Sequence, residues 1–255
     1  MPAPRPVLLA AIDPAAALGL MTRLPVPVNG EKAAGRGAQA AWAWPLAGAL
    51  VGFLGGAAFW AAAGLGLPPL LAAFSALTVQ VFVTGALHED GLADSADGLW
   101  GGWTRERRLE IMRDSRIGSY GVLALVLSLG IKAAALAALS PGGAVVALIV
   151  TGAASRAAMG AVMASLLPAR SDGLSVKTGR PSLATLLVGV VLTLILCLLL
   201  LPLVVVAVFV AAITITTILW ARVARAKIGG QTGDILGATQ QLCEVAGLAA
   251  LSAML

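Results

Sequence analysis

The stretch LATLLVGVVLTLILCLLLLPLVVVAVFVAAITITTILWA occupies residues 183–221 and holds no charged residue over its 39 positions. A helix needs about 20 apolar residues to cross about 30 Å of hydrocarbon, so this run is too long for one crossing. Pro202 divides it, because proline interrupts the hydrogen bonds of a helix. The stretch therefore predicts two membrane-spanning helices, 183–201 and 203–221, joined by a tight turn.

The rest of the chain is similarly apolar, since 59% of its 255 residues are hydrophobic and only 11% are charged. Soluble domains contain about 25% charged residues. No segment between the apolar stretches is long enough to bury a core of its own. We therefore expect an all-α polytopic membrane bundle of about seven transmembrane helices, forming one integral membrane domain over 1–255, with short interfacial helices such as 7–21. The five further spans are expected at 38–64, 70–88, 119–139, 144–167 and 235–255.

The charged residues alternate between the connections of these spans. Basic residues gather in the connections 23–36, 89–118, 168–182 and 222–232, whereas 65–69, 140–143 and 201–203 carry no charge. Seven spans place all four basic connections on one side, which the positive-inside rule assigns to the cytoplasm. This topology accounts for the net charge of +5. We therefore expect contact with membrane lipid and no nucleic-acid partner.

The densest polar motif is HEDGLADSADG at 88–98. If the helix of the preceding span continues, Asp90, Asp94 and Asp97 fall at positions i, i+4 and i+7 and share one face. Three stacked carboxylates repel one another and need a cation, and hard oxygen ligands suit Mg²⁺ bound together with substrate phosphates. The alternative is a solvated helix end that pairs with the arginines of 105–116.

A second polar block extends from Arg105 to Tyr120. Arg113 and Arg116 flank Asp114 and are candidates to bind phosphate oxygens, because the guanidinium fork matches their geometry. The alternative for basic residues at this boundary is to set topology and to contact anionic lipid.

Lys132 and Arg156 lie deep within expected spans, and Glu244 is the acidic residue buried comparably. A charge in hydrocarbon is costly, so both cations should face a polar interior. Either they line a substrate cavity, or they form a structural ion pair or extend to the interface.

The fourth block, GGQTGDILGA at 229–238, enters the last span. Glycine lets backbone N–H groups approach a phosphate closely, and Asp234 could ligate a metal or cap the helix. His88 is the single histidine of the chain and could act as a base or serve in packing.

Together these blocks resemble the cobalamin synthase family, the adenosylcobinamide-GDP ribazoletransferases. The resemblance rests on TRLPVP at 22–27, GALHEDGLADSADG at 85–98, IMRDSRIGSYG at 111–121 and GGQTGD at 229–234 with LGA at 236–238. These motifs follow one another in the order of the family and cover nearly the whole chain.

The resemblance implies transfer of the adenosylcobinamide-phosphate moiety of adenosylcobinamide-GDP to α-ribazole or α-ribazole 5′-phosphate. GMP would be released and adenosylcobalamin or its 5′-phosphate formed, with Mg²⁺ required. Such an enzyme belongs to the bacterial cytoplasmic (inner) membrane with its active face toward the cytoplasm, and formation of a homo-oligomer is left open.

The residue hypotheses that accompany this function fall into three groups. The metal ligands would be Glu89, Asp90, Asp94, Asp97 and Asp234. The catalytic residues would be Asp94, Asp97, Arg113, Arg116 and Lys132. The substrate-binding residues would be His88, Asp114, Ser115, Arg156, Gly230, Thr232, Gly233 and Glu244. The alternative function is a cation-coupled membrane transporter, which explains less well why acids and arginines gather at one face.

Overall fold

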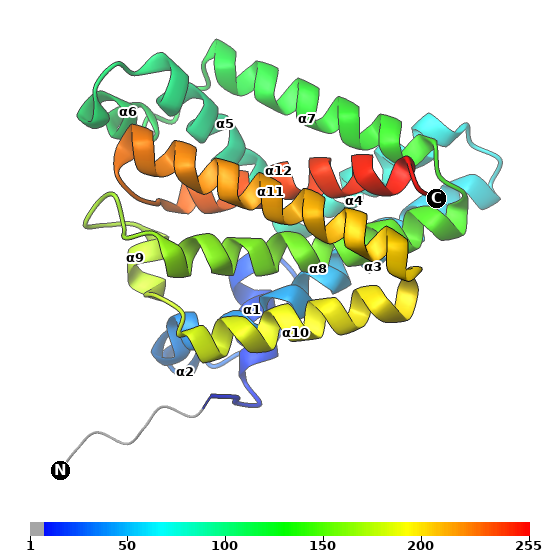
Figure 1. The fold of residues 1–255 in the computed structure, drawn as a ribbon, viewed down its shortest axis with the longest axis horizontal. Helices are drawn as coiled ribbons and strands as arrows, with labels where there is room; N and C mark the ends of the chain where they lie inside the picture. Colours follow the sequence, from blue (N-terminus) through cyan, green and yellow to red (C-terminus); the bar gives the residue numbers. More distant parts are fainter. Residues whose placement is uncertain (1–7) are drawn as a thin grey trace.

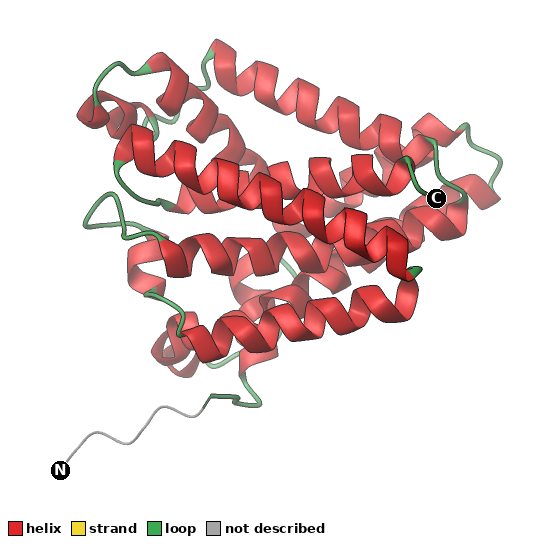
Figure 2. Cartoon of the chain, in the orientation of Figure 1, coloured by secondary structure: helices red, strands yellow, loops and turns green. Residues whose placement is uncertain are grey.

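The structure is a computed structural model that describes residues 8–255 of the chain. Within these residues it contains twelve α-helices and one 3₁₀ helix and no β-strand (Figure 2). The predicted all-α membrane bundle is therefore confirmed. The first seven residues, including the start of the expected interfacial helix 7–21 and of the expected single domain, lie outside the described residues.

Seven long helices correspond to the seven expected spans. They are α3 (Trp44–Gly64), α4 (Pro69–Thr84), α7 (Ser119–Ala137), α8 (Pro141–Ser165), α10 (Leu183–Leu200), α11 (Leu203–Ile228) and α12 (Gly233–Ser252). Among the described residues, five segments are long and apolar enough to cross a membrane: Gly30–Gly64, α7, α8, α10 and α11. The count becomes six if α4 and the helix after it form one bent span. The expected number of seven spans stays a prediction.

The apolar stretch 183–221 forms the expected hairpin, in which α10 ends at Leu200 and α11 begins at Leu203, with Pro202 as its N-cap. Helix α11 continues to Ile228, beyond the expected end at residue 221. At 1.5 Å per residue its 26 residues extend about 39 Å, longer than the hydrocarbon layer. Its basic last turn, with Arg225 and Lys227, therefore projects beyond the apolar region.

The expectation that the acidic motif continues the helix of the span before it is wrong. Helix α4 ends at Thr84, and Gly85 and Ala86 both adopt left-handed backbone angles, with φ of 65° and 58°. Helix α5 (Leu87–Gly101) then leaves at 91° to α4. The three aspartates nevertheless all lie on α5, so their expected spacing on one helix is kept.

The motif at 22–27 packs against this break. The backbone N–H of Arg23 donates to the carbonyl oxygen of Val83 at 2.7 Å. A side chain at Gly85 would meet Arg23, because its Cβ would lie 2.6 Å from Nε. Glycine at this position thus serves both the left-handed turn and the close packing that fixes the direction of α5.

Small residues let the central helices approach closely. Helices α3 and α8 cross where Gly48 meets Gly152, and a Cβ on Gly48 would collide with the carbonyl group of Gly152. Membrane helices commonly pack through such small residues, because backbones then come into direct van der Waals contact. Helix α12 lies at the centre of the bundle, in contact with α5, α7, α8 and α11 (Figure 1).

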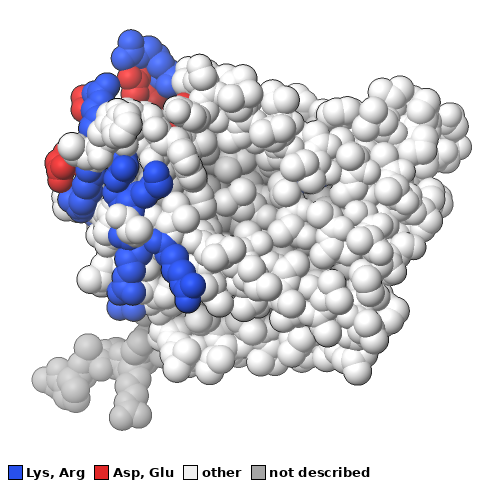
Figure 3. Space-filling model, turned by 45° about the horizontal axis from the view of Figure 1, so that its top comes forward, with Lys and Arg blue, Asp and Glu red and all other residues white. Residues whose placement is uncertain are grey.

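The charged residues lie at one end of the bundle. Figure 3 shows lysine and arginine side chains gathered there, while the rest of the visible face carries none. The same end holds the short helices α2 (Gly30–Arg36), α6 (Arg105–Ile111) and α9 (Leu174–Thr178), and the turns after α3, α7 and α10 lie at the other (Figure 1). This arrangement agrees with the alternation of charge along the sequence.

The N-terminal helix α1 (Asp13–Met21) begins later than the expected interfacial helix 7–21, since residues 8–12 are not helical. It is joined to the 3₁₀ helix η1 (Gly37–Ala43), since Trp42 donates to Asp13 Oδ2 at 2.7 Å and Arg36 Nε donates to Oδ1 at 2.6 Å. Burial would raise the pKa of Asp13, but these hydrogen bonds and one from Ala10 hold it below its usual value. Asp13 therefore fastens α1 to the bundle as a carboxylate.

Candidate active site

The acidic helix α5 crosses α12 at a pair of glycines. A Cβ on Gly91 would lie 2.9 Å from the carbonyl oxygen of Asp234 and 3.1 Å from Cα of Gly237. A Cβ on Gly237 would lie 3.2 Å from Cα of Gly91. Because neither helix has a side chain here, the backbones touch. The crossing brings Asp90 and Asp94 of α5 next to Asp234 at the start of α12.

Asp94 shows the electrostatic effect of this crossing. It lies on α5, outside the five segments that can each cross the membrane, and it is about half buried. Burial raises the pKa of Asp94 to about 7, reinforced by the negative charges of Asp90, Asp234 and Asp97 and opposed by Arg170. The cluster thus carries more negative charge than its surroundings neutralise, which favours binding of a cation.

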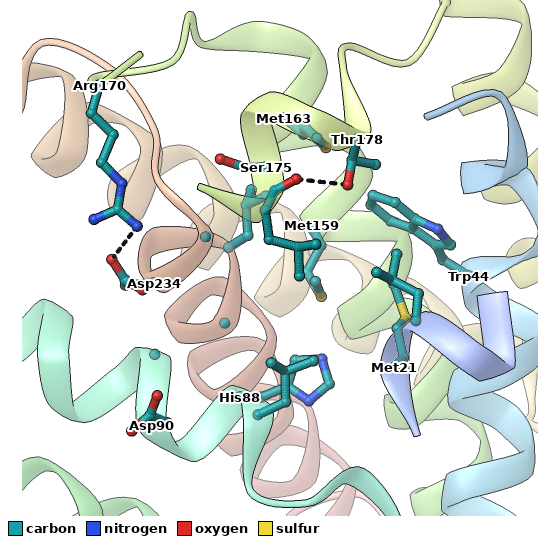
Figure 4. Close-up of a pocket in the computed structure, with 17 residues that line it drawn as sticks. Met21, Trp44, His88, Asp90, Met159, Met163, Arg170, Ser175, Thr178 and Asp234 are labelled. Atoms are coloured by element: carbon teal, nitrogen blue, oxygen red, sulfur yellow. Dashed lines mark hydrogen bonds and ion pairs between the residues drawn. The ribbon is translucent and has the colours of Figure 1, made fainter. Parts of the chain in front are cut away.

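Asp234 is held in place by its neighbours. Thr232 caps α12 by accepting a hydrogen bond from the backbone N–H of Ile235 at 3.3 Å, and its hydroxyl donates to Asp234 Oδ2 at 3.1 Å. Arg170 Nη2 lies 3.5 Å from the same Oδ2 atom. The capping function considered for Asp234 therefore belongs to Thr232, and the Asp234 carboxylate is directed toward Arg170 (Figure 4).

The donor set suits Mg²⁺ in part. In residues 8–255 no three His, Cys, Asp or Glu side chains stand close enough to hold one metal ion by themselves. Mg²⁺ usually keeps several waters and takes one or two carboxylates together with substrate phosphates. The carboxylates of Asp90, Asp94 and Asp234 therefore suit it by chemical type, although their spacing does not form a complete metal site.

Two of the expected metal ligands, Asp97 and Glu89, accept hydrogen bonds from other parts of the bundle. Asp97 accepts hydrogen bonds from the backbone N–H groups of Gly118 at 2.7 Å and Gly121 at 2.9 Å. It thereby fixes the start of α7, where a carboxylate also complements the helix dipole. Glu89 Oε1 accepts from Gln241 Nε2 at 2.8 Å, whereas its buried Oε2 has no hydrogen-bond partner. Neither oxygen of Asp97 is left without a hydrogen bond.

A pocket of about 160 Å³ opens beside the acidic cluster. Arg170, Asp234 and Asp90 lie at one end of it, and Trp44 and Met21 lie at the other (Figure 4). Between these ends lie His88, Met159, Met163, Ser175 and Thr178. The polar lining consists of His88, Asp90, Arg170, Ser175, Thr178 and Asp234. Of the residues predicted from sequence, the pocket thus contains His88, Asp90, Gly233 and Asp234.

Sequence reasoning missed three polar residues of this pocket, and Arg170 is the charged one beside Ser175 and Thr178. Its backbone is fixed by the glycine-rich motif: Ala169 N–H donates to the Gln231 carbonyl at 2.8 Å, and Gln231 N–H donates to the Leu167 carbonyl at 2.9 Å. Gly230 has no room for a Cβ, which would collide with the Leu167 carbonyl oxygen. The motif at 229–231 therefore holds the segment that carries Arg170. In the sequence, the basic residues of the connection 168–182 indicate only the topology of the chain. A short loop has no periodicity, so its sequence does not indicate where the side chain of Arg170 points.

The three expected intramembrane charges lie together, away from the pocket. Glu244 Oε1 is 2.8 Å from Arg156 Nη1, and its Oε2 is 3.3 Å from Lys132 Nζ. Lys132 also donates to Gln241 at 2.7 Å, and Gln241 connects this group to Glu89. All three charged side chains are buried, and none lines the pocket. This arrangement corresponds to the structural ion pair considered as an alternative to a substrate cavity.

The second polar block lies on the surface. Arg116 pairs with Asp114 at 2.7 Å, and hydrogen bonds from Arg116 lower the pKa of Asp114 to about 2. Ser115 is exposed. Arg113 Nη2 lies 2.7 Å from Asp172 Oδ1, and Arg170 Nε lies 3.7 Å from the same oxygen. Arg113 is therefore linked to the rim of the pocket through Asp172, while Arg116, Asp114 and Ser115 do not line it.

Comparison with known proteins bears on what this site does. The chain is 48% identical over 244 residues to a protein of Azorhizobium caulinodans, covering 92% of each chain. It is 45% identical over 230 residues to one of Bradyrhizobium diazoefficiens (90% of this chain, 88% of the relative) and 44% identical over 255 residues to one of Rhizobium johnstonii (96% and 98%). Each is named adenosylcobinamide-GDP ribazoletransferase. No solved structure matches the chain.

The names of these relatives describe a transferase, which favours the enzyme interpretation over the cation-coupled transporter. The family profile described as cobalamin-5-phosphate synthase, CobS, matches residues 13–252, which include every helix of the bundle. The chain belongs to the cobalamin-5-phosphate synthase family.

Proposed function

We propose that this protein is a Mg²⁺-dependent adenosylcobinamide-GDP ribazoletransferase. It transfers the adenosylcobinamide-phosphate moiety of adenosylcobinamide-GDP to α-ribazole or its 5′-phosphate and releases GMP. Membership of the family supports the reaction. The observation that carries the assignment to a site is the glycine crossing of α5 and α12. It brings Asp94 close to the pocket that Asp90, Asp234 and Arg170 line.

The carboxylates of Asp90, Asp94 and Asp234 would hold Mg²⁺, which would neutralise charge on the pyrophosphate of the donor substrate. Their crowding supports this assignment, because it raises the pKa of Asp94 to about 7. Asp97 is not needed for it, since both of its oxygens accept backbone hydrogen bonds.

The protein side chains then perform two tasks. Arg170 binds non-bridging phosphoryl oxygens, for which its planar fork is suited. Asp94 accepts the proton of the attacking ribosyl hydroxyl through a carboxylate oxygen that does not ligate the metal. The ribosyl oxygen forms a bond to the phosphorus that carries adenosylcobinamide, the bond from that phosphorus to the bridging oxygen breaks, and GMP leaves with the electron pair.

We place the protein in the bacterial cytoplasmic membrane, with the pocket facing the cytoplasm. The positive-inside rule supports this orientation, since lysine and arginine gather at the end of the bundle that carries the pocket (Figure 3). A nucleotide-linked substrate would then reach the acidic cluster from the aqueous side.

The test is GMP release by protein held in nanodiscs and supplied with adenosylcobinamide-GDP and α-ribazole, in Mg²⁺ or in EDTA. We expect metal-dependent release of GMP together with the cobalamin product, lost in Asp94→Ala. Glu110→Ala is the matched control, because Glu110 is an exposed carboxylate that pairs only with Arg107 at the surface. A folded wild-type protein that releases no GMP in any divalent metal would refute the assignment.

A further inference from the structure

The pocket beside the acidic cluster has two chemically different halves. On one side lie Arg170, Asp234 and Asp90, next to the carboxylates discussed above (Figure 4). On the other side the wall is formed by Met21, Trp44, Met159 and Met163, which come from α1, α3 and α8. Such a pocket matches a ligand with an apolar ring at one end and polar groups at the other.

Several buried polar atoms in this pocket have no hydrogen-bond partner within the protein. They are Nε1 of Trp44, Nε2 of His88, Oγ of Ser175, and Nε and Nη1 of Arg170. His88 and Ser175 are 1% and 5% exposed and both line the pocket. Because a buried polar atom without a partner costs free energy, their convergence on one cavity points to a ligand that supplies the missing partners.

The size of the pocket limits what can bind. At about 160 Å³ it is smaller than the roughly 300–1,000 Å³ typical of sites for whole drug-sized ligands. It can therefore enclose one small ring system, and the rest of a larger ligand would lie outside it. The two substrates of the proposed reaction carry three such ring systems. They are guanine and the adenine of the adenosyl group in the donor, and the base of ribazole in the acceptor.

The apolar wall distinguishes the base of ribazole from the two purines of the donor. Guanine presents a row of hydrogen-bond donors and acceptors along one edge. The four wall residues offer it one polar group besides the thioether sulfur atoms, which is the indole N–H of Trp44. Thioether sulfur and the face of an indole ring pack favourably on a flat aromatic surface. The benzimidazole of ribazole has such a surface and few polar atoms, so it suits this wall better than guanine.

Resting on the function proposed above, we propose that this pocket binds the acceptor nucleoside, with its planar apolar base against Met21, Trp44, Met159 and Met163 and its ribosyl group toward Arg170 and Asp234. The three methionines and Trp44 then determine which base is accepted. This orientation directs the ribosyl hydroxyls toward the acidic cluster, where the proposed transfer takes place.

Calorimetric titration of α-ribazole and of GDP into nanodisc-held protein in Mg²⁺ tests the assignment. Met159→Trp fills the apolar half, and we expect at least a tenfold loss of affinity for α-ribazole with the affinity for GDP unchanged. Ala161→Trp is the matched control, because Ala161 is on the same helix but lines a different, apolar groove between α8, α10 and α11. It should keep both affinities.

A Met159→Trp protein that binds α-ribazole as the wild type does, or one that loses GDP instead, overturns the inference. A wild-type protein that binds neither compound and releases no GMP refutes the proposed function itself, so the two failures are distinguishable.

If the Met159→Trp protein does not fold, a labelling experiment takes the place of the titration. In it, a methanethiosulfonate reagent labels the cysteine of Ser175→Cys. We expect α-ribazole but not guanosine to slow that labelling, with exposed Ser165→Cys as control; equal protection by both nucleosides, or by neither, contradicts the inference.

Discussion

Arg170 and Asp234 face each other across the polar end of the pocket, with 3.5 Å between Nη2 and Oδ2. The guanidinium keeps two further nitrogens without hydrogen-bond partners, so it can bind a phosphoryl group without leaving Asp234. We expect Arg170→Gln to lower kcat/KM for adenosylcobinamide-GDP roughly ten- to hundredfold, the range for one hydrogen bond to a charged group. The kcat/KM of Arg170→Lys should lie between those of the wild type and Arg170→Gln, because lysine offers a point charge without the planar fork of arginine.

Steady-state kinetics of GMP release would measure this effect. Arg180→Gln is the control in the same connection, since Arg180 is exposed and donates only to the carbonyl of Ala164. Equal activity of Arg170→Gln and Arg180→Gln would show that Arg170 does not bind the substrate.

Asp94 should make both stability and metal binding depend on pH. Its pKa is raised from 3.8 to about 7 in the folded protein, so without metal the unfolded chain releases this proton at lower pH than the folded chain does. The free energy of unfolding should therefore decrease as the pH rises from about 4 to about 7, and the fall should be smaller in Asp94→Asn.

With Mg²⁺ present, the free energy of unfolding should instead increase as the pH rises, because the metal ion competes with the proton for the same carboxylates. We expect the affinity for Mg²⁺ to weaken as the pH falls below about 7, the pKa of Asp94. Thermal unfolding at several pH values, with Mg²⁺ and with EDTA, would measure both effects. A melting temperature in EDTA that responds identically to pH in wild type and Asp94→Asn would contradict the assignment.

The crossing of α5 and α12 should tolerate no side chain at Gly91. A Cβ there would lie 2.9 Å from a backbone oxygen, so the helices must move apart and carry Asp90 and Asp94 away from Asp234. We expect Gly91→Ala to lose most of its activity while remaining inserted in the membrane. Gly130→Ala on α7 is the control, because nothing lies within 4 Å of the Cβ it adds. Wild-type kcat/KM in Gly91→Ala would show that this contact is not required.

Much of the fold could be predicted from the sequence because lipid imposes simple rules. The apolar lengths located the long helices, and Pro202 correctly marked the turn between α10 and α11. The break at Gly85 and Ala86 was not foreseen, since Ala86 with its φ of 58° carries no local signal for a left-handed conformation. That turn depends on the packing of a distant segment, as the contact between Arg23 and Gly85 shows.

The candidate site could be predicted only in part, for a similar reason. Spacing along one helix placed Asp90 and Asp94 together, and the same rule grouped them with Asp97, whose carboxylate instead binds the start of α7. Arg170 depends on a contact between two loops, Leu167 to Ala169 with Gln231, which helical periodicity does not describe.

The buried charges of Lys132, Arg156 and Glu244 predict an asymmetry in stability. Glu244 neutralises both cations, so Glu244→Gln leaves two buried positive charges without a direct anionic partner. Removing one partner of a buried ion pair costs about 3–5 kcal/mol, and we expect a loss of that size. Lys132→Met leaves the pair of Arg156 and Glu244 intact at 2.8 Å, so it should cost clearly less. Unfolding in mixed detergent micelles would measure the free energy of unfolding of both variants. An equal loss of stability in the two would indicate that Glu244 does not neutralise both Arg156 and Lys132.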